Sequence, residues 1–163
     1  MISKPLENFV YPTNPQNLFG AVRKHDIHTG IDLFCPENEI VHAISDCIVS
    51  KIGYFTGTKS IPETPWWNDT EYVICKTIWE NKTLYFLYGE LLSSVSVGDI
   101  LMAGSPLGSI KRVIKNDKGL PTTMLHFEIY KSLPENPVFW YHNEEQPDIL
   151  INPETIINKA LNR

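Results

Sequence analysis

The sequence contains few cysteines, and the three present, Cys35, Cys47 and Cys75, form no Cys-x-x-Cys pair. An odd number of widely spaced cysteines argues against a disulfide framework. We therefore expect buried, reduced thiols that pack as small apolar side chains. Because Cys35 follows Asp32 by three residues, a metal or redox role for this thiol stays open at the level of sequence.

Long hydrophobic runs and a strong charge imbalance are also absent. No apolar stretch approaches the roughly 18 residues that a membrane-spanning helix needs, and residues 1–8 hold no apolar core of signal-peptide length. We therefore expect a cytoplasmic protein, unless its leader is missing from this sequence or another route exports it. The net charge of −5 is mild and argues against nucleic acid or an anionic membrane as partner. The oligomeric state stays open.

Helical periodicity is rare in this chain. From Asn152 to Leu161 a capping-type asparagine, a proline at the first helical position and apolar residues at helical spacing predict one short helix. The 163 residues, 42% of them apolar, suffice for one domain with a buried core. We expect an all-β fold, an antiparallel β-sandwich with barrel-like character and a short C-terminal helix. Its strands are predicted at 31–34, 40–43, 47–52, 71–79, 83–88, 95–101, 105–110 and 125–130.

A long segment without periodicity, from Thr56 to Thr70, contains the pair Trp66-Trp67. Loops of this length are often functional. The two tryptophans either border a cleft or cover the core, and the sequence leaves both interpretations open.

The stretch His28-Thr29-Gly30-Ile31-Asp32 holds a histidine and an aspartate four residues apart. Such side chains commonly bind zinc, but two ligands of one zinc must lie within about 4 Å of each other. In a straight strand these two would be roughly 13 Å apart. The chain must therefore bend between them, and Gly30 is the residue that bends at least cost. We expect His28 at the end of a loop and Asp32 on the strand that follows.

A further candidate ligand lies on the strand predicted near residue 126. Alternation places Leu125, Phe127 and Ile129 on one face, and Met124, His126 and Glu128 on the other. His126 is either a buried structural histidine or a metal ligand. Glu128 either accepts a hydrogen bond from a ligand imidazole or faces solvent.

These motifs together resemble the lysostaphin-type zinc metallopeptidases, which cut peptide cross-links of bacterial peptidoglycan. The segments His28–Asp32 and Leu125–Glu128 match the family's first and last motifs, and Tyr88-Gly89-Glu90-Leu91 resembles its Tyr-x-His-Leu. The resemblance implies a groove over one zinc ion per chain, held by His28, Asp32 and His126, and a peptide or peptidoglycan fragment as partner. The resemblance covers about residues 18–130, so we expect a peptidase-like domain at 18–133, preceded by an N-terminal arm at 1–17 and followed by a C-terminal extension at 134–163. Further segments in the family's order are Phe19-Gly20 with Arg23, 41–46 and 97–108.

The sequence departs from this family at the two histidines that position the water and move its proton. Met124 stands at one of these positions and can neither donate nor carry a proton. Glu90 stands at the other and is our candidate catalytic residue, as a general base. His25 is a metal ligand in a shifted register, replaces a missing imidazole, or lies on the surface. Around the metal or groove we expect Glu128, Met124, His25, Trp66 and Trp67.

Two alternatives to a hydrolase remain. One is a catalytically impaired pseudopeptidase that binds zinc and a peptide or protein partner. The other is a module of the same β architecture with an unrelated ligand, as in sugar-transport phosphocarrier domains.

Overall fold

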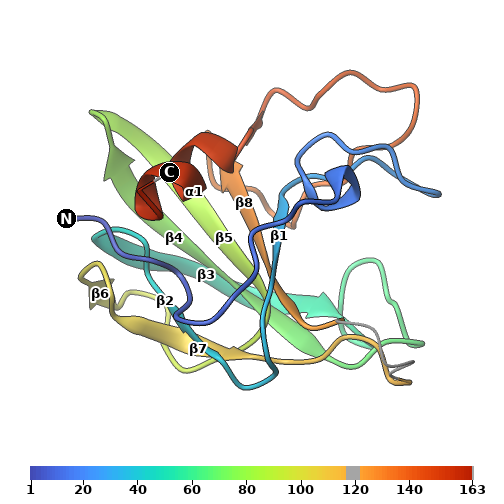
Figure 1. Cartoon of the computed structure of the whole chain (residues 1–163), viewed down its shortest axis with the longest axis horizontal. Helices are drawn as coiled ribbons and strands as arrows, with labels where there is room; N and C mark the ends of the chain where they lie inside the picture. Colours follow the sequence, from blue (N-terminus) through green and yellow to red (C-terminus); the bar gives the residue numbers. More distant parts are fainter. Residues whose placement is uncertain (117–121, 163) are drawn as a thin grey trace.

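The computed structural model describes residues 1–116 and 122–162, which form nine strands and one short α-helix (Figure 1). A 3₁₀ turn, η1 (Pro15–Asn17), precedes the strands, and the helix α1 (Glu154–Ala160) follows them. The strands are β1 (Ile31–Phe34), β2 (Ile40–His42), β3 (Cys47–Thr56), β4 (Thr70–Trp79), β5 (Lys82–Ser93), β6 (Ile100–Leu101), β7 (Pro106–Ile110), β8 (Met124–Tyr130) and β9 (Leu150–Ile151).

The strands pair antiparallel in the order β1-β8-β5-β4-β3-β6, and β9 pairs with β8. The end of β5 also pairs with β7, which pairs with β2, so the sheet folds over itself without closing into a barrel. The expected all-β antiparallel fold with a short C-terminal helix is confirmed. Within the described residues, no helix is long and apolar enough to cross a membrane.

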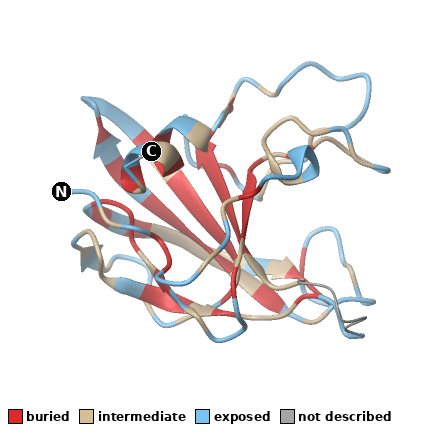
Figure 2. Cartoon of the chain, in the orientation of Figure 1, coloured by how far each residue is buried: buried red, intermediate tan, exposed pale blue. Residues whose placement is uncertain are grey.

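Alternation along β8 separates two hydrophobic clusters, one on each face of the sheet. Leu125, Phe127 and Ile129 point into the larger cluster, which β2, β7 and α1 cover. Tyr130 points to the opposite face, into a smaller cluster with Tyr72, Ile74, Leu87 and Leu150. The central strands are consequently buried along much of their length (Figure 2). Polar side chains on the second face of β8 are therefore buried as well.

Several predicted boundaries differ from the structure. The strand expected at 95–101 is wrong before Ile100, because Gly98 adopts a φ of +96° in a turn that the Asp99 carboxylate closes on the Ser96 N–H. The C-terminal helix is confirmed, but it begins at Glu154, and Pro153 caps it instead of occupying its first turn. The two-residue strand β9 carries no periodic signal and was not predicted.

The chain segment after β8, residues 133–149, forms no helix or strand and is called the strap below. It crosses beside the segment that precedes β1 (Figure 1). The Ile27 N–H donates to the Trp140 carbonyl at 2.7 Å, and the Trp140 ring lies 5.6 Å from that of Phe19. The strap thus covers the same face of the sheet on which His126 lies.

Candidate metal centre and groove

Three ligand-type side chains meet on the second face of the sheet, where β1 runs beside β8. Asp32 lies directly opposite His126 in the β1–β8 register. The Oδ1 atom of Asp32 is 2.8 Å from Nδ1 of His126 and 3.1 Å from Nε2 of His28, and the two ring nitrogens are 3.3 Å apart. All three side chains are buried. The structure therefore brings together the three residues that the resemblance implied.

Gly30 has a different role from the one expected. Its φ does not lie in the left-handed region, so the bend after His28 needs no glycine for backbone freedom. A Cβ at this position would instead lie 2.3 Å from the carbonyl oxygen of Phe127 and 2.9 Å from Cγ of Glu128. Glycine is needed because the chain passes in direct contact with β8, which brings His28 close to His126 on that strand.

Each imidazole is held in one tautomer by the partner of its outer nitrogen. Nδ1 of His28 lies 2.8 Å from the Leu18 carbonyl, which can only accept, so Nδ1 carries the proton. Nε2 of His126 lies 2.7 Å from the Glu128 carboxylate and donates to it. The inner nitrogens of both rings therefore direct lone pairs at Asp32 Oδ1. Three converging lone pairs require a cation between them, or an extra proton.

The charges of the buried side chains also indicate that a cation or an extra proton lies between the three ligand atoms. Burial opposes a charged imidazole, but hydrogen bonds to Asp32 and Glu128 outweigh it and raise the pKa of His126 to about 10. Burial likewise opposes the Asp32 carboxylate, yet hydrogen bonds from His126 and His28 hold its pKa well below the usual range. The site thus stabilises one ionised carboxylate and, without a metal, a proton on His126.

The donor set fits zinc. Two neutral imidazoles and one carboxylate are typical ligands of catalytic zinc, which keeps a fourth position open. In a tetrahedral site with ligand distances of about 2.0–2.2 Å, ligand atoms lie roughly 3.3–3.6 Å from one another. The observed distance between the two ring nitrogens, 3.3 Å, reaches this range, and the two distances to Asp32 Oδ1, 2.8 and 3.1 Å, are shorter.

Glu128 is buried and does not face solvent. Besides His126, its carboxylate accepts from the hydroxyls of Thr29 and Tyr130. Of the two alternatives left open for Glu128, the structure selects the hydrogen bond to the imidazole. Thr29 and Tyr130 had no sequence signal of their own.

Arg23 fixes the orientation of Asp32. Its Nη2 donates to Asp32 Oδ2 at 2.7 Å and to the carbonyl of Gln16, and Nε also donates to that carbonyl. One carboxylate oxygen is thereby engaged, and Oδ1 is left to face the two histidines. The sequence pattern indicates Arg23 only as a residue before the first motif and predicts no role for it.

Glu90 occupies a bulge in β5. Tyr72 pairs with Gly89 and Glu71 pairs with Leu91, so Glu90 is the extra residue, and its φ is +67°. Such a conformation costs a non-glycine residue about 1–2 kcal/mol and re-aims its side chain. Burial, reinforced by the charge of Asp32, raises the pKa of Glu90 to about 8.

Two cavities, of about 200 and 400 Å³, meet at the metal centre and form the groove. Both are lined by Arg23, Trp67, Glu90 and His126. The smaller cavity lies between the loop at 57–69 and the strap, and its apolar lining residues are Ile27, Phe55, Ile61, Pro62, Pro137, Val138, Phe139 and Trp140. Met124, with Val113 and Ile114, lines the larger cavity.

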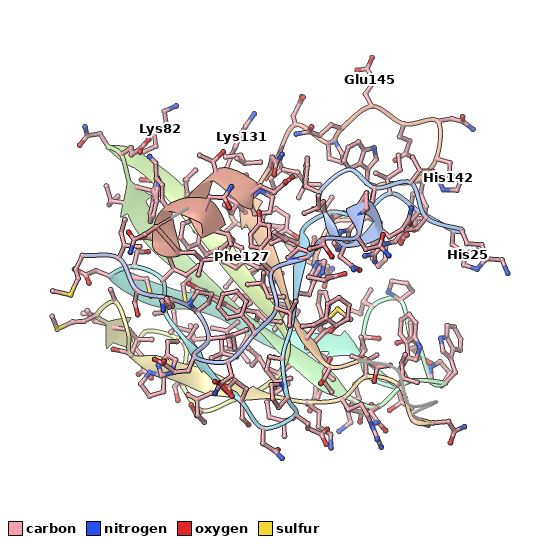
Figure 3. The ribbon with its side chains drawn as sticks, in the orientation of Figure 1. His25, Lys82, Phe127, Lys131, His142 and Glu145 are labelled. Carbon is pink, nitrogen blue, oxygen red and sulfur yellow. The ribbon has the colours of Figure 1, made fainter. Side chains whose placement is uncertain are left out.

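The remaining candidates are placed as follows. Trp67 borders the groove with 38% of its surface exposed, and Trp66, 63% exposed, packs edge-on against it without lining either cavity. His25 is exposed, lines neither cavity and points away from the sheet (Figure 3). His142, a strap residue outside the predicted site, donates from Nε2 to the backbone carbonyls of Arg23 and Asp26. Cys35, Cys47 and Cys75 are buried free thiols, as expected.

Comparisons with known proteins identify the family and the fold. Residues 26–139 match the model of peptidase family M23. The fold is similar to that of a mutant catalytic domain of the prophage-encoded M23 protein EnpA from Enterococcus faecalis, with 19% identity over 94% of this chain and 95% of that chain and a TM-score of 0.60. It is also similar to the catalytic domain of the antimicrobial peptidase lysostaphin from Staphylococcus simulans, with 17% identity over 87% of this chain and 89% of that chain and a TM-score of 0.56. A zinc-containing peptidase from Vibrio cholerae is 19% identical over 78% of this chain and 36% of that chain, with a TM-score of 0.54. No curated protein sequence matches the chain.

Proposed function

The chain belongs to peptidase family M23, and on that basis we propose that it is a zinc-dependent endopeptidase acting on peptides of the peptidoglycan type. The observation that supports zinc most directly is the convergence of three lone pairs, from His28, Asp32 and His126, inside a buried cluster. A zinc ion there would polarise a substrate carbonyl and activate water for its hydrolysis.

Glu90 is proposed as the general base. It lines both cavities together with His126, so a peptide lying over the metal centre passes its carboxylate. A base whose pKa lies near the working pH combines a useful ionised fraction with the strength to take a proton. The raised pKa of Glu90 and the bulge that turns it into the groove both favour this role.

Arg23 and Glu128 are proposed to keep the ligands in place during turnover. Arg23 holds the outer oxygen of Asp32, and Glu128 holds the outer nitrogen of His126. Neither reaches the metal position with the atom it uses, so both act on the orientation of ligands.

Met124 supports the alternative of a pseudopeptidase that holds zinc and a peptide without cutting it. Its thioether lines the larger cavity but offers no proton and no hydrogen bond to an oxyanion. In that case the groove would retain binding, with Glu90 unable to carry the chemistry alone.

Metal analysis and cleavage assays test the proposal. The purified protein should hold about one zinc per chain, and His126→Ala should lose it. Glu90→Gln should keep zinc and lower the cleavage rate of cross-linked peptidoglycan fragments by about 10²- to 10⁴-fold. The matched control is Glu145→Gln on the exposed outer side of the strap, which should cut at the parent rate.

Each outcome has a distinct meaning. Unchanged cleavage by Glu90→Gln removes Glu90 from the mechanism. A zinc-loaded parent protein that binds the fragments without cutting them establishes the pseudopeptidase. A parent protein that takes up no zinc refutes the metal centre itself.

A further inference from the structure

The strap is joined to a metal ligand by a series of hydrogen bonds that passes through one hydroxyl group. Tyr130, the last residue of β8, is fully buried. Its hydroxyl accepts from the Val138 N–H at 3.1 Å and donates to Oε2 of Glu128. The other oxygen of that carboxylate accepts the Nε2 proton of His126 at 2.7 Å. Four groups in series thus connect the backbone of the strap to the imidazole.

The direction of this series is fixed by its ends. A backbone N–H can only donate, so the Tyr130 oxygen accepts from Val138 and its own proton is left for Glu128. Burial and the charge of Glu128 hold the pKa of Tyr130 well above its usual range, so the hydroxyl keeps that proton. The carboxylate, charged and accepting, then orients the His126 ring with its inner lone pair toward Asp32.

The strap has anchors besides the hydrogen bond to the Tyr130 hydroxyl. Trp140 packs on Phe19, and its carbonyl accepts from Ile27, next to the ligand His28. Lys51 on β3 donates to the backbone carbonyls of Pro134 and Glu135. Residues 137–140, which follow the Lys51 contacts and end at Trp140, form a wall of the smaller cavity. The same segment therefore shapes the groove and contacts the Tyr130 hydroxyl.

We propose that Tyr130 is a positioning residue that couples the seating of the strap to the affinity of the metal centre. The inference rests on the proposed function, since it concerns the same three ligands. Removing the hydroxyl leaves Oε2 of Glu128 buried with one donor fewer, because Thr29 and His126 both use Oε1. The carboxylate then turns to recover a donor, and the His126 ring loses its fixed orientation.

Zinc affinity of the full chain, measured by competition with a chromogenic chelator, tests the coupling. Tyr130→Phe should bind zinc about tenfold more weakly, the lower end of the effect usual for groups that support metal ligands. The matched control is Tyr88→Phe on the adjacent strand β5. Tyr88 is equally buried, and its hydroxyl also accepts from a backbone N–H, that of Ile44, but its ring packs in the larger cluster, on the face of the sheet opposite Glu128. This control should bind zinc within about twofold of the parent protein.

A second pair of variants asks whether the strap acts through this hydroxyl. Trp140→Ala loosens the strap and should weaken zinc binding in the parent background. The same substitution should have a clearly smaller effect when Tyr130→Phe is already present. In the cobalt-substituted protein, Tyr130→Phe should also change the visible absorption bands, which report the ligand geometry and not the overall stability.

The outcomes separate this inference from the function on which it rests. Equal losses of affinity in Tyr130→Phe and Tyr88→Phe, or none in Tyr130→Phe, would overturn the coupling while leaving the zinc site intact. Independent, multiplying effects of Trp140→Ala and Tyr130→Phe would show that the strap acts by another path. A parent protein without zinc affinity would refute the proposed function, and this is evident before any variant is made.

Discussion

Gly30→Ala is expected to damage the metal centre from a position that carries no ligand. The added Cβ would lie 2.3 Å from the Phe127 carbonyl oxygen. Carbon and oxygen atoms rarely come closer than about 3.3 Å. The segment before β1 and strand β8 must therefore separate by roughly 1 Å. The clash is with backbone, so no side-chain rotation relieves it.

The size of the effect follows from this separation. Overpacking of a closed interior costs about 1–3 kcal/mol, and the upper value applies where backbone must move. For a domain of this length, about 3 kcal/mol corresponds to a fall in melting temperature of about 6–12 °C. Zinc ligands tolerate displacements of about 0.2 Å. Moving His28 away from His126 by roughly 1 Å should therefore weaken zinc binding by more than about 100-fold.

Thermal unfolding and chelator competition measure the two effects, with Gly98→Ala as the control. Gly98 has a φ of +96°, and a Cβ added to it would meet no atom within 4 Å. Alanine there should therefore cost about 1–2 kcal/mol of backbone strain and leave the zinc affinity unchanged. If Gly30→Ala kept the zinc affinity of the parent protein, close approach at Gly30 would not be what brings the ligands together.

Three further predictions concern the groups around the ligands. The pKa of Glu90 is raised from 4.5 to about 8 in the fold, so as the pH rises the unfolded chain loses the Glu90 proton before the folded protein does. The contribution of Glu90 to the free energy of unfolding of the metal-free protein therefore decreases between about pH 4.5 and about pH 8. The melting temperature of Glu90→Gln relative to the parent should rise over that interval, and a constant difference would contradict a raised pKa of Glu90 in the fold. Arg23→Gln frees Asp32 to rotate and should weaken zinc binding about tenfold by chelator competition, whereas Lys24→Gln, exposed beside it, should not. Trp67→Ala removes a groove wall and should raise KM severalfold in peptide cleavage with kcat little changed, whereas Trp66→Ala should change KM less.

The alternating strand pattern made β8 and its two faces predictable. Leu125, Phe127 and Ile129 do enter the main core, and His126 and Glu128 share the other face. The pairing of β1 with β8 could not be derived from either strand alone, because register depends on the partner. The order of the family motifs supplied that information, and the structure places Asp32 opposite His126.

The groups that orient the ligands were less accessible to sequence reasoning. Leu18 acts through its backbone carbonyl, which carries no residue-specific signal. Tyr130 follows His126 by four residues and looks like an ordinary aromatic strand residue until Val138 is placed beside it. The strap itself has no periodicity, and its position depends on contacts with residues more than a hundred positions earlier. Such long-range contacts leave no local pattern.

Substitutions on the two sides of the groove should differ in their effect on the metal centre. The loop at 57–69 contributes Ile61, Pro62 and Trp67 to the walls of the cavities. Within the part of the chain that the structure describes, it makes no hydrogen bond to His28, Asp32 or His126. The opposite side is attached to His126 through Tyr130 and to the neighbour of His28 through Trp140. New substrate preferences should therefore arise most readily by exchanging the loop at 57–69. Grafts into the strap would alter selectivity and metal retention at the same time.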